Sequence, residues 1–334
     1  MNILINGLGN IGTTIANLCL DFKEILAIDK VYVYKNLPES WLGQDIELLR
    51  EKGAIICSAK ANTFDVIAEQ IDYVFECRDH DIVQKAPNVY LAFSHLKGIV
   101  AQGSEVGHGL PVMIGVNSEL AHNQPRVHVV SCNSHGIAAV MQVFAGSKLE
   151  NLVDADMVVV RRSEDLSSSK KLVGSNVVIR HRDPEKGTHH ATDVRSLFET
   201  VDTNCSLSTS DINTPSQLMH AVRFNLQLEK AMVTADIPSL IERNPFCSAT
   251  EKFDSNKIFE LGRRYGIQGR IYSHAIICTS SIMLQGDRVK GWAFIPQEGN
   301  SILSTIEAYL QQTNHPERQT VIENLKKKLL RACW

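Results

Sequence analysis

The stretch NILINGLGNIGTTIANLCLDF, residues 2 to 22, decides which class of fold the chain is expected to adopt. Its first five residues are typical of a short strand, and the later apolar residues recur at helical spacing. Between the two lies Gly7-Leu8-Gly9-Asn10-Ile11-Gly12, whose glycines permit a tight turn, a close approach of pyrophosphate to bare backbone, and close packing of helix on strand. Strand, glycine turn and helix in this order favour a dinucleotide-binding site over a tight turn alone.

The next expected strand, residues 30 to 36, ends at Tyr34-Lys35-Asn36. A lysine cannot accept hydrogen bonds from ribose hydroxyls, but it can pair with a 2′-phosphate. This strand end therefore leans towards NADP without excluding NAD. A solvated lysine at a strand end is an equally weighted interpretation.

Further strand candidates alternate with helical or loop segments, which predicts an α/β fold with a mostly parallel sheet. Ligands of such sheets lie at the carboxyl ends of the strands. The candidates are residues 53 to 57, 72 to 77, 97 to 102, 111 to 115 and 127 to 132.

The composition sets the outer limits of function. A chain of 334 residues with 44% hydrophobic residues is expected to form two domains, and its net charge of −3 gives no reason to expect nucleic acid or an anionic membrane as partner. The start of the chain reads as a strand rather than a secretion signal, so we expect a cytoplasmic protein. The eight cysteines include no Cys-x-x-Cys pair, which argues against a zinc site and a disulfide framework.

Cys132 stands where the expected strand 127 to 132 meets the helical pattern of NSHGIAAVMQVF. The positive end of a helix lowers the pKa of a thiol and favours the thiolate, which is the reactive form. A buried cysteine that only fills space is an equally weighted interpretation of the local pattern.

Five motifs in order resemble the archaeal-type, or type II, glyceraldehyde-3-phosphate dehydrogenases. The resemblance covers nearly the whole chain and favours a nucleophilic role for Cys132. The motifs are ILINGLGNIGTTIA (3 to 16), VVSCNSHG (129 to 136), VVVRRSED (158 to 165), THHATDV (188 to 194) and PSQLMHAVRFNLQLE (215 to 229).

The resemblance implies specific roles. Cys132 corresponds to the nucleophile and His220 to the general base, so that the thiolate attacks an aldehyde and the histidine takes the proton as the thiohemiacetal loses its hydride. Inorganic phosphate then releases the thioester as an acyl phosphate. Asn133 and the main-chain amides at the start of the helix are candidate donors to the oxyanion.

Anionic ligands require cations or hydrogen-bond donors in the second domain. Adjacent arginines on a strand face opposite ways, so at most one of the pair at 161 and 162 is expected to reach the ligand, and we favour Arg161. Asp183 and Asp193 are carboxylates that could complete a metal site with the histidine pair, but the spacing matches no zinc pattern, and we expect no metal. The expected substrate and phosphate contacts are Ser134, His135, Arg161, Arg162, His189 and His190.

The chain also departs from the family pattern. Ser134 and His135 replace a threonine pair after Cys-Asn, Ser216 and Gln217 replace another, and residues 76 to 80 (ECRDH) replace a Thr-Pro-Gly-Gly turn. We expect His135 to be a capping or solvent-facing residue, the alternative being a contact to the acyl group or a second proton acceptor near Cys132. These changes leave a different aldehyde or acyl phosphate as the second candidate substrate, and a non-catalytic nucleotide-binding protein as the third reading.

The predicted organisation is a Rossmann domain at residues 1 to 132, an α+β catalytic domain with a mixed or antiparallel sheet at 133 to 300, and a segment at 301 to 334 that returns to the first domain. The lysine run in the last segment fits a solvated helix face. The resemblance implies a homotetramer that uses NADP or NAD, a phosphorylated aldehyde and phosphate. The expected cofactor contacts are Asn6, Gly7, Gly9, Asn10, Ile11, Gly12, Lys35, Asn36, Gly103 and Gln297.

Overall fold

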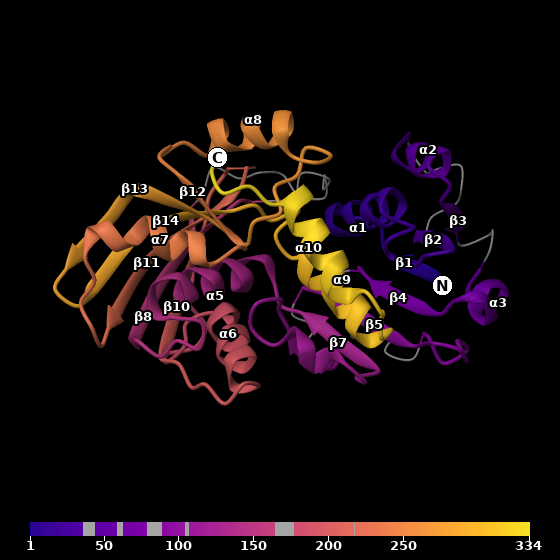
Figure 1. The fold of residues 1–334 in the computed structure, drawn as a ribbon, viewed down its shortest axis with the longest axis horizontal. Coiled ribbons are helices and arrows are strands. Elements are labelled where there is room, and N and C mark those ends of the chain that lie inside the picture. The colour runs from indigo at the N-terminus through magenta and orange to yellow at the C-terminus, as the bar shows by residue number, and fades with distance from the viewer. Residues whose placement is uncertain (36–43, 59–62, 79–88, 104–106, 164–176, 217) are drawn as a thin grey trace. The chain divides into compact units, whose positions relative to one another are not determined.

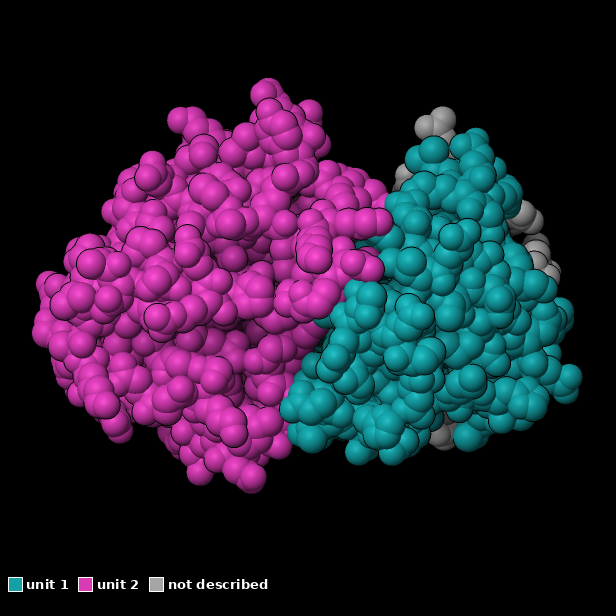
Figure 2. Space-filling view, viewed as in Figure 1, with its two compact units in different colours: residues 1–112, 118–129, 304–322 teal, residues 113–117, 130–303, 323–334 magenta. Residues whose placement is uncertain are grey.

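The computed structural model describes residues 1–35, 44–58, 63–78, 89–103, 107–163, 177–216 and 218–334 (Figure 1). The predicted contact Asn36 and the variable positions Asp79, His80 and Gln217 lie outside these residues. The chain forms two compact units (Figure 2). Unit 1 comprises residues 1–112, 118–129 and 304–322, and unit 2 comprises residues 113–117, 130–303 and 323–334.

Unit 1 is built on a seven-stranded sheet of order β3-β2-β1-β4-β5-β7-β6, in which every pairing is parallel. The predicted parallel α/β fold is confirmed. The strands are β1 (Asn2–Asn6), β2 (Lys30–Lys35), β3 (Ile55–Ser58), β4 (Tyr73–Glu76), β5 (Gly98–Gln102), β6 (Leu110–Val112) and β7 (Arg126–Val129).

In unit 1, helices α1, α2 and α3 each lie between two consecutive strands of the sequence. Helix α1 buries Ile15 and Leu18 of the predicted apolar stripe. The helices are α1 (Asn10–Asp21), α2 (Gln44–Glu51), α3 (Phe64–Ile67), the 3₁₀ turns η2 (Ala68–Gln70) and η3 (Ser118–Ala121), and α9 (Ile302–Gln312). Helix α10 (Arg318–Leu329) is divided between the units, since residues up to 322 belong to unit 1 and residues from 323 to unit 2.

Helix α9 supplies core residues to unit 1. The Tyr309 ring lies edge-on to the Tyr73 ring at 4.9 Å, and its hydroxyl donates to the Leu26 carbonyl oxygen at 2.9 Å. Thr305 Oγ1 donates to Gln102 Oε1 at 3.0 Å, and Gln312 Nε2 donates to the Gln124 carbonyl oxygen at 2.7 Å. Residues 304–322 are thus integral to the unit formed by the first part of the sequence, whereas residues 323–334 belong to unit 2.

Unit 2 contains a second seven-stranded sheet, of order β12-β13-β14-β11-β8-β10-β9. It is mixed, as predicted: β10 runs parallel to β8 and β12 parallel to β13, whereas the other pairs are antiparallel. The strands are β8 (Leu152–Arg161), β9 (Val178–Arg180), β10 (Leu207–Asn213), β11 (His220–Leu228), β12 (Cys247–Thr250), β13 (Ala275–Gln285) and β14 (Arg288–Ile295).

Helix α5 (Cys132–Ala145) packs on this sheet together with α6 and α7 (Figure 1). Strand β11 alternates buried and part-buried residues, so Val222, Phe224 and Leu226 point into the core under α5. The other helical elements of the unit are α6 (His189–Glu199), the 3₁₀ turn η4 (Thr234–Asp236), α7 (Ile237–Arg243) and α8 (Ser255–Tyr265).

One local prediction needs correction. The strand expected to reach Cys132 ends at Val129, and Cys132 already belongs to α5. Thr234 begins a 3₁₀ turn, Asp236 is the N-cap of α7, and Pro238 lies in the first turn of that helix. Within the described ranges, no helix combines the length and hydrophobicity needed to cross a lipid bilayer.

Candidate active site

The glycine turn of unit 1 has three glycines with different roles. Gly7 has φ +104°, and a Cβ on Gly12 would lie 1.9 Å from the Gly7 carbonyl oxygen, so these two positions exclude side chains for internal reasons. Gly9 is exposed, and a Cβ there would meet nothing within 4 Å. Helix α1 starts at Gly9 without a side-chain cap, so its first amides are open to an anion. These features fit the pyrophosphate of a dinucleotide.

Asn6, at the end of β1, is committed to partners inside the unit. Its Nδ2 donates to the Tyr90 hydroxyl at 2.6 Å and lies 3.5 Å from Glu76 Oε2. Arg78 binds both oxygens of the buried Glu76 carboxylate at 2.6 to 3.1 Å. Burial alone would lower the pKa of Arg78, but the hydrogen bonds and charge of Glu76 raise it. The segment that departs from the family pattern therefore contains a buried ion pair beside Gly7.

The other expected cofactor contacts are distributed over both units. Lys35 is the last residue of β2, and Asn10 and Ile11 form the first turn of α1. Gly103 follows β5 with φ +85° and open space around its Cα. Gln297 follows β14 and belongs to unit 2.

Cys132 is the first residue of α5 and is partly exposed. Ser131 caps the helix, since its Oγ accepts from the Ser134 amide at 3.3 Å. Asn300 Nδ2 donates to the Cys132 carbonyl oxygen at 2.8 Å and to the His274 carbonyl oxygen at 3.1 Å. The main chain on both sides of the thiol is thus fixed, while the helix start favours the thiolate.

His190, from the first turn of α6, links this helix start to the strand ends. Its Nε2 lies 3.3 Å from Asn133 Nδ2 and 3.4 Å from Asp211 Oδ2, and its Nδ1 lies 3.4 Å from Ser131 Oγ. All of these residues except Ser131 are buried. His190 therefore fixes the position of the Asn133 side chain, which is next to Cys132 in the sequence.

Asp211 is the buried anion of the group. Its Oδ2 accepts from Arg161 Nη1 at 3.2 Å, and its Oδ1 accepts from Thr188 Oγ1 at 3.4 Å. Burial would raise the pKa of the Asp211 carboxyl, but the hydrogen bonds and charges of His190 and Arg161 outweigh it, so that the pKa is lowered. Asp211 therefore stays charged and orients both His190 and Arg161.

His220 begins β11, on the face that β11 buries. Its Nδ1 accepts from the Arg162 amide at 3.1 Å. Burial lowers its pKa well below the ordinary value, and the charges of Arg161, Arg162 and His190 lower it further, against the opposing effect of Asp211. A neutral ring that accepts at Nδ1 carries its proton on Nε2, so Nε2 is a hydrogen-bond donor.

The two arginines have different surroundings. Arg162 is buried and binds Glu298 Oε1 at 2.8 Å, while Glu298 Oε2 accepts from Arg270 at 3.2 Å. Arg161 is paired with Asp211, and 27% of its side chain is exposed. Arg161 is therefore the more accessible of the two.

Comparison with known proteins finds similarity to individual proteins of one name. No family model matches the chain. Over 92% of its length the chain is 25% identical to glyceraldehyde-3-phosphate dehydrogenase of Methanococcus maripaludis strain C6, of which it covers 92%. It is 26% identical to glyceraldehyde-3-phosphate dehydrogenase 1 of Methanosarcina barkeri over 73% of the chain and 71% of the relative. The enzyme of that name from Hyperthermus butylicus is 22% identical over 91% of the chain and 89% of the relative.

Over most of its length the chain is thus similar to several archaeal proteins named glyceraldehyde-3-phosphate dehydrogenase. The two sheets agree with this relationship, since a parallel Rossmann sheet and a mixed sheet are what the resemblance implies. The name of the relatives indicates a nicotinamide dinucleotide as the class of cofactor.

The positions that depart from the archaeal-type pattern have clear partners. Ser134 Oγ donates to Asp193 Oδ2 at 3.0 Å. His135 is fully buried, so the expectation of a solvent-facing residue was wrong. Its Nδ1 lies 3.1 Å from the Ser131 carbonyl oxygen, and its ring packs edge-on against the His274 ring at 5.1 Å. Burial lowers the pKa of His135 to about 4, against the opposing effect of its main-chain hydrogen bonds.

His189, His190 and Asp193 offer ligand atoms within 4.8 Å of one another and are geometrically able to hold a metal ion. Both nitrogens of His190 already face hydrogen-bond partners, and the cationic Arg161 approaches the same Asp211. Asp183, the other carboxylate considered as a ligand, is not part of this group. The donor set fits a hydrogen-bonded anion site better than a metal site.

Sequence reasoning missed several residues of the site: Asp211, Thr188 as its partner, His274, Glu298 and Asn300. Only Asp211 carried a local signal, because it shares the buried face of β10 with Leu207 and Thr209. An aspartate at such a position requires a buried partner.

Proposed function

We propose that the chain is a phosphorylating aldehyde dehydrogenase that oxidises glyceraldehyde 3-phosphate to 1,3-bisphosphoglycerate with NADP or NAD. The observation that carries the proposal is Cys132 at the capped start of α5, next to Asn133 and the buried pair of His190 and Asp211. The names of the relatives support the same reaction. A homotetramer and a cytoplasmic location belong to the same proposal.

The covalent steps use the chain's own residues. The Cys132 thiolate attacks the aldehyde carbon, and the carbonyl oxygen becomes an oxyanion, which Asn133 and the first amides of α5 stabilise. A bound nicotinamide would supply the hydride acceptor, and loss of the hydride from this carbon would leave a thioester on Cys132. Phosphate oxygen then attacks the thioester carbon, and the Cys132 thiolate leaves as the acyl phosphate forms.

For His220 we propose a role that differs from the general base implied by the family resemblance. Since Nδ1 accepts from the Arg162 amide, the neutral ring offers an N–H at Nε2 and no lone pair there. We propose that His220 donates this hydrogen to the substrate oxygen and stabilises the oxyanion. His220→Asn keeps a donor but has no basic nitrogen, so it retains activity that His220→Ala loses, whereas equal losses in both variants indicate a base.

Arg161, His189 and His190 are the proposed anion contacts, whereas the buried Arg162 is paired with Glu298. The glycine turn would hold the dinucleotide, with Gly9 and the open amides of α1 at the pyrophosphate and Lys35 at the adenosine ribose. Lys35 favours NADP over NAD.

The second candidate is the same chemistry on another aldehyde or acyl phosphate. It is favoured by the Ser134 hydroxyl, which is committed to Asp193, and by the buried His135, which together replace the threonine pair of the family pattern. A nucleotide-binding protein without catalysis is disfavoured, because such a protein has no use for a cysteine held in this network.

The deciding experiment measures the initial rate of nicotinamide reduction with glyceraldehyde 3-phosphate, with and without phosphate, for the native chain and for Cys132→Ala. A phosphate-dependent rate that falls at least roughly 10³-fold in the variant supports the proposal. No rate with the native chain, although cofactor binds, favours the second candidate. Erythrose 4-phosphate and acetaldehyde then serve as alternative substrates.

A further inference from the structure

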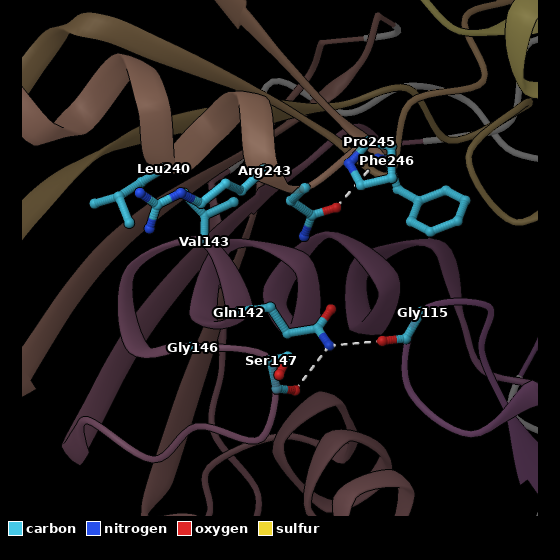
Figure 3. Close-up of a pocket in the computed structure, with 10 residues that line it drawn as sticks. Gly115, Gln142, Val143, Gly146, Ser147, Leu240, Arg243, Pro245 and Phe246 are labelled. Atoms are coloured by element: carbon cyan, nitrogen blue, oxygen red, sulfur yellow. Dashed lines mark hydrogen bonds between the residues drawn. The ribbon is translucent and has the colours of Figure 1, made fainter.

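Unit 2 contains a cavity of about 310 Å³ that the proposed reaction does not use (Figure 3). It lies at the C-terminal end of α5, between that helix and the end of α7 with the segment that follows. The volume suits a small organic molecule. The side chains that matter for its chemistry are Gln142, Val143, Leu240, Arg243 and Phe246.

The cavity wall combines apolar surface with a single charge. Val143, Leu240 and Phe246 supply apolar atoms, and Arg243 is the only charged residue among those that line it. In the part of the chain that the structure describes, the Arg243 guanidinium has no hydrogen-bond or ion-pair partner. A carboxylate that enters the cavity gains a charge-assisted hydrogen bond to Arg243.

Gln142 fixes the shape of the wall rather than competing for a ligand. Its Nε2 donates to the carbonyl oxygens of Gly115, at 2.8 Å, and Ser147, at 3.0 Å, as Figure 3 shows. The amide thus joins α5 to two loops. The cavity is consequently formed before any ligand arrives, and it fits a short apolar carboxylate with its hydrocarbon part against Phe246.

Phe246 connects the cavity to Cys132. Its ring stacks on the His274 ring at 4.8 Å with an interplanar angle of 12°, and the His274 amide donates to the Phe246 carbonyl oxygen at 2.7 Å. The His274 carbonyl oxygen accepts from Asn300 Nδ2, which also donates to the Cys132 carbonyl oxygen. A displacement of Phe246 would therefore shift His274 and, through it, Asn300, which binds the Cys132 carbonyl oxygen.

Helix α5 provides a second connection. Gln142 lies ten residues after Cys132 on the same helix, a distance of roughly 15 Å along its axis. His135, one turn after the cap, contacts His274 as well. A ligand in the cavity would therefore contact the C-terminal end of α5, and through Phe246 and His274 it would also affect the start of α5, where Cys132 lies.

We propose that this cavity is a regulatory site for a small apolar carboxylate, and that its occupation changes the reactivity of Cys132 through Phe246, His274 and Asn300. The binding part goes beyond the proposed function and does not depend on it. The regulatory part rests on Cys132 being the reactive thiol. Its readout is alkylation, which needs no substrate and so remains informative if the proposed reaction fails.

The binding test uses isothermal titration calorimetry of the full chain with three probes: 3-phenylpropionate, hexanoate and indole-3-acetate. At least one probe is expected to saturate a single site, and its uncharged amide and the Arg243→Met variant are expected to weaken binding at least about tenfold. Arg263→Met, at an exposed arginine of α8, is the matched control and leaves binding unchanged. The site is disproved if no probe saturates below roughly 10 mM, or if Arg243→Met binds equally well.

The coupling test measures the rate at which iodoacetamide alkylates Cys132, followed by peptide mapping, with and without the saturating probe. The probe is expected to change this rate about twofold or more. Phe246→Leu keeps an apolar wall but removes the ring that stacks on His274, so the bound probe no longer changes the rate. An unchanged rate in the native chain, at saturation, overturns the regulatory part.

Discussion

Helices α1 and α5 both begin at a site that we assign to function, yet they begin in opposite ways. Helix α1 starts at an exposed glycine with no side-chain cap. Helix α5 is capped by the Ser131 hydroxyl, and its first residue, Cys132, has a carbonyl oxygen that accepts a hydrogen bond from Asn300. One helix start is bare, whereas the other is surrounded by fixed side chains.

The difference reflects what each helix start has to do. A diffusing pyrophosphate satisfies the open amides of α1, so any side chain there would compete with the ligand. The thiol of α5 is part of the chain and needs a fixed direction, so Ser131, His190 and Asn300 supply the order in advance. An uncapped helix N-terminus suits a ligand that binds reversibly, and a capped N-terminus suits a nucleophile that must keep one orientation.

The largest effect separates two glycines of the α1 turn. Gly12→Ala is expected to lower the free energy of unfolding by about 3 kcal/mol or more, because the new Cβ would lie 1.9 Å from the Gly7 carbonyl oxygen. Gly9→Ala, with open space around it, is expected to leave stability within about 0.5 kcal/mol but to weaken NADP binding about tenfold. Urea unfolding and cofactor titration of both variants measure this contrast. If Gly9→Ala destabilises the fold as much as Gly12→Ala does, then the glycine at position 9 is required for packing within the turn and not for cofactor binding.

Acid is expected to destabilise the α5 start through His135. Its pKa is about 4 in the folded chain and about 6.5 when unfolded, so both states are neutral above pH 6.5 and stability is complete there. Between pH 6.5 and 4 only the unfolded state takes up the proton, and this residue removes about 1.4 kcal/mol of unfolding free energy per pH unit. His274 and His128, whose pKa values are also lowered by burial, act in the same direction.

The check is the slope of unfolding free energy against pH for His135→Asn, with the exposed His122→Asn as control. His135→Asn should have the shallower slope between pH 6 and 4, whatever its stability at pH 7. Equal slopes for the two variants would show that His135 is protonated in the folded chain.

Loss of the α5 cap has a smaller effect. Ser131→Ala is expected to lower the free energy of unfolding by about 1 kcal/mol, because the Ser134 amide loses its acceptor. Thr63→Ala is the matched control, since Thr63 is the N-cap of α3 without a side-chain hydrogen bond. Thermal unfolding should move for Ser131→Ala only, and a shift of equal size in Thr63→Ala would assign the effect to something other than capping.

The smallest effect concerns Lys35. Lys35→Ala is expected to reduce NADP affinity by about 0.5 to 1 kcal/mol, the range of an exposed ion pair, and to leave NAD affinity unchanged. Protection from thermal unfolding by each dinucleotide reports the difference. Greater protection of the native chain by NAD than by NADP contradicts the assignment.

The fold was largely predictable from the sequence, because its signals are local. Residues 2 to 22 contain a strand, a turn and a helix whose residues interact within that stretch, and the alternation in β11 reports burial directly. The strand end near Cys132 was misplaced by three residues, because Val130 is as apolar as the residues of β7 before it. Apolar pattern alone does not distinguish the last strand residue from a buried loop residue.

The candidate site was predictable only in part. Cys132, His190 and His220 belong to motifs, whereas Asn300 and Glu298 act on partners 168 and 136 residues away, Cys132 and Arg162 respectively. No local pattern encodes such pairs, because they exist only when strand order and register bring them together. The burial of His135 escaped prediction for the same reason, since its partner His274 precedes β13.

Helix α9 has a consequence for how the protein is made. The first 129 residues leave the ribosome long before Tyr309 and Gln312, which complete their core. At bacterial to eukaryotic synthesis rates, the remaining 193 residues up to position 322 take roughly 10 to 40 s. During that interval Tyr73 and its neighbours lack the packing that α9 provides. We therefore expect chaperones that recognise exposed apolar surface to bind the nascent N-terminal segment.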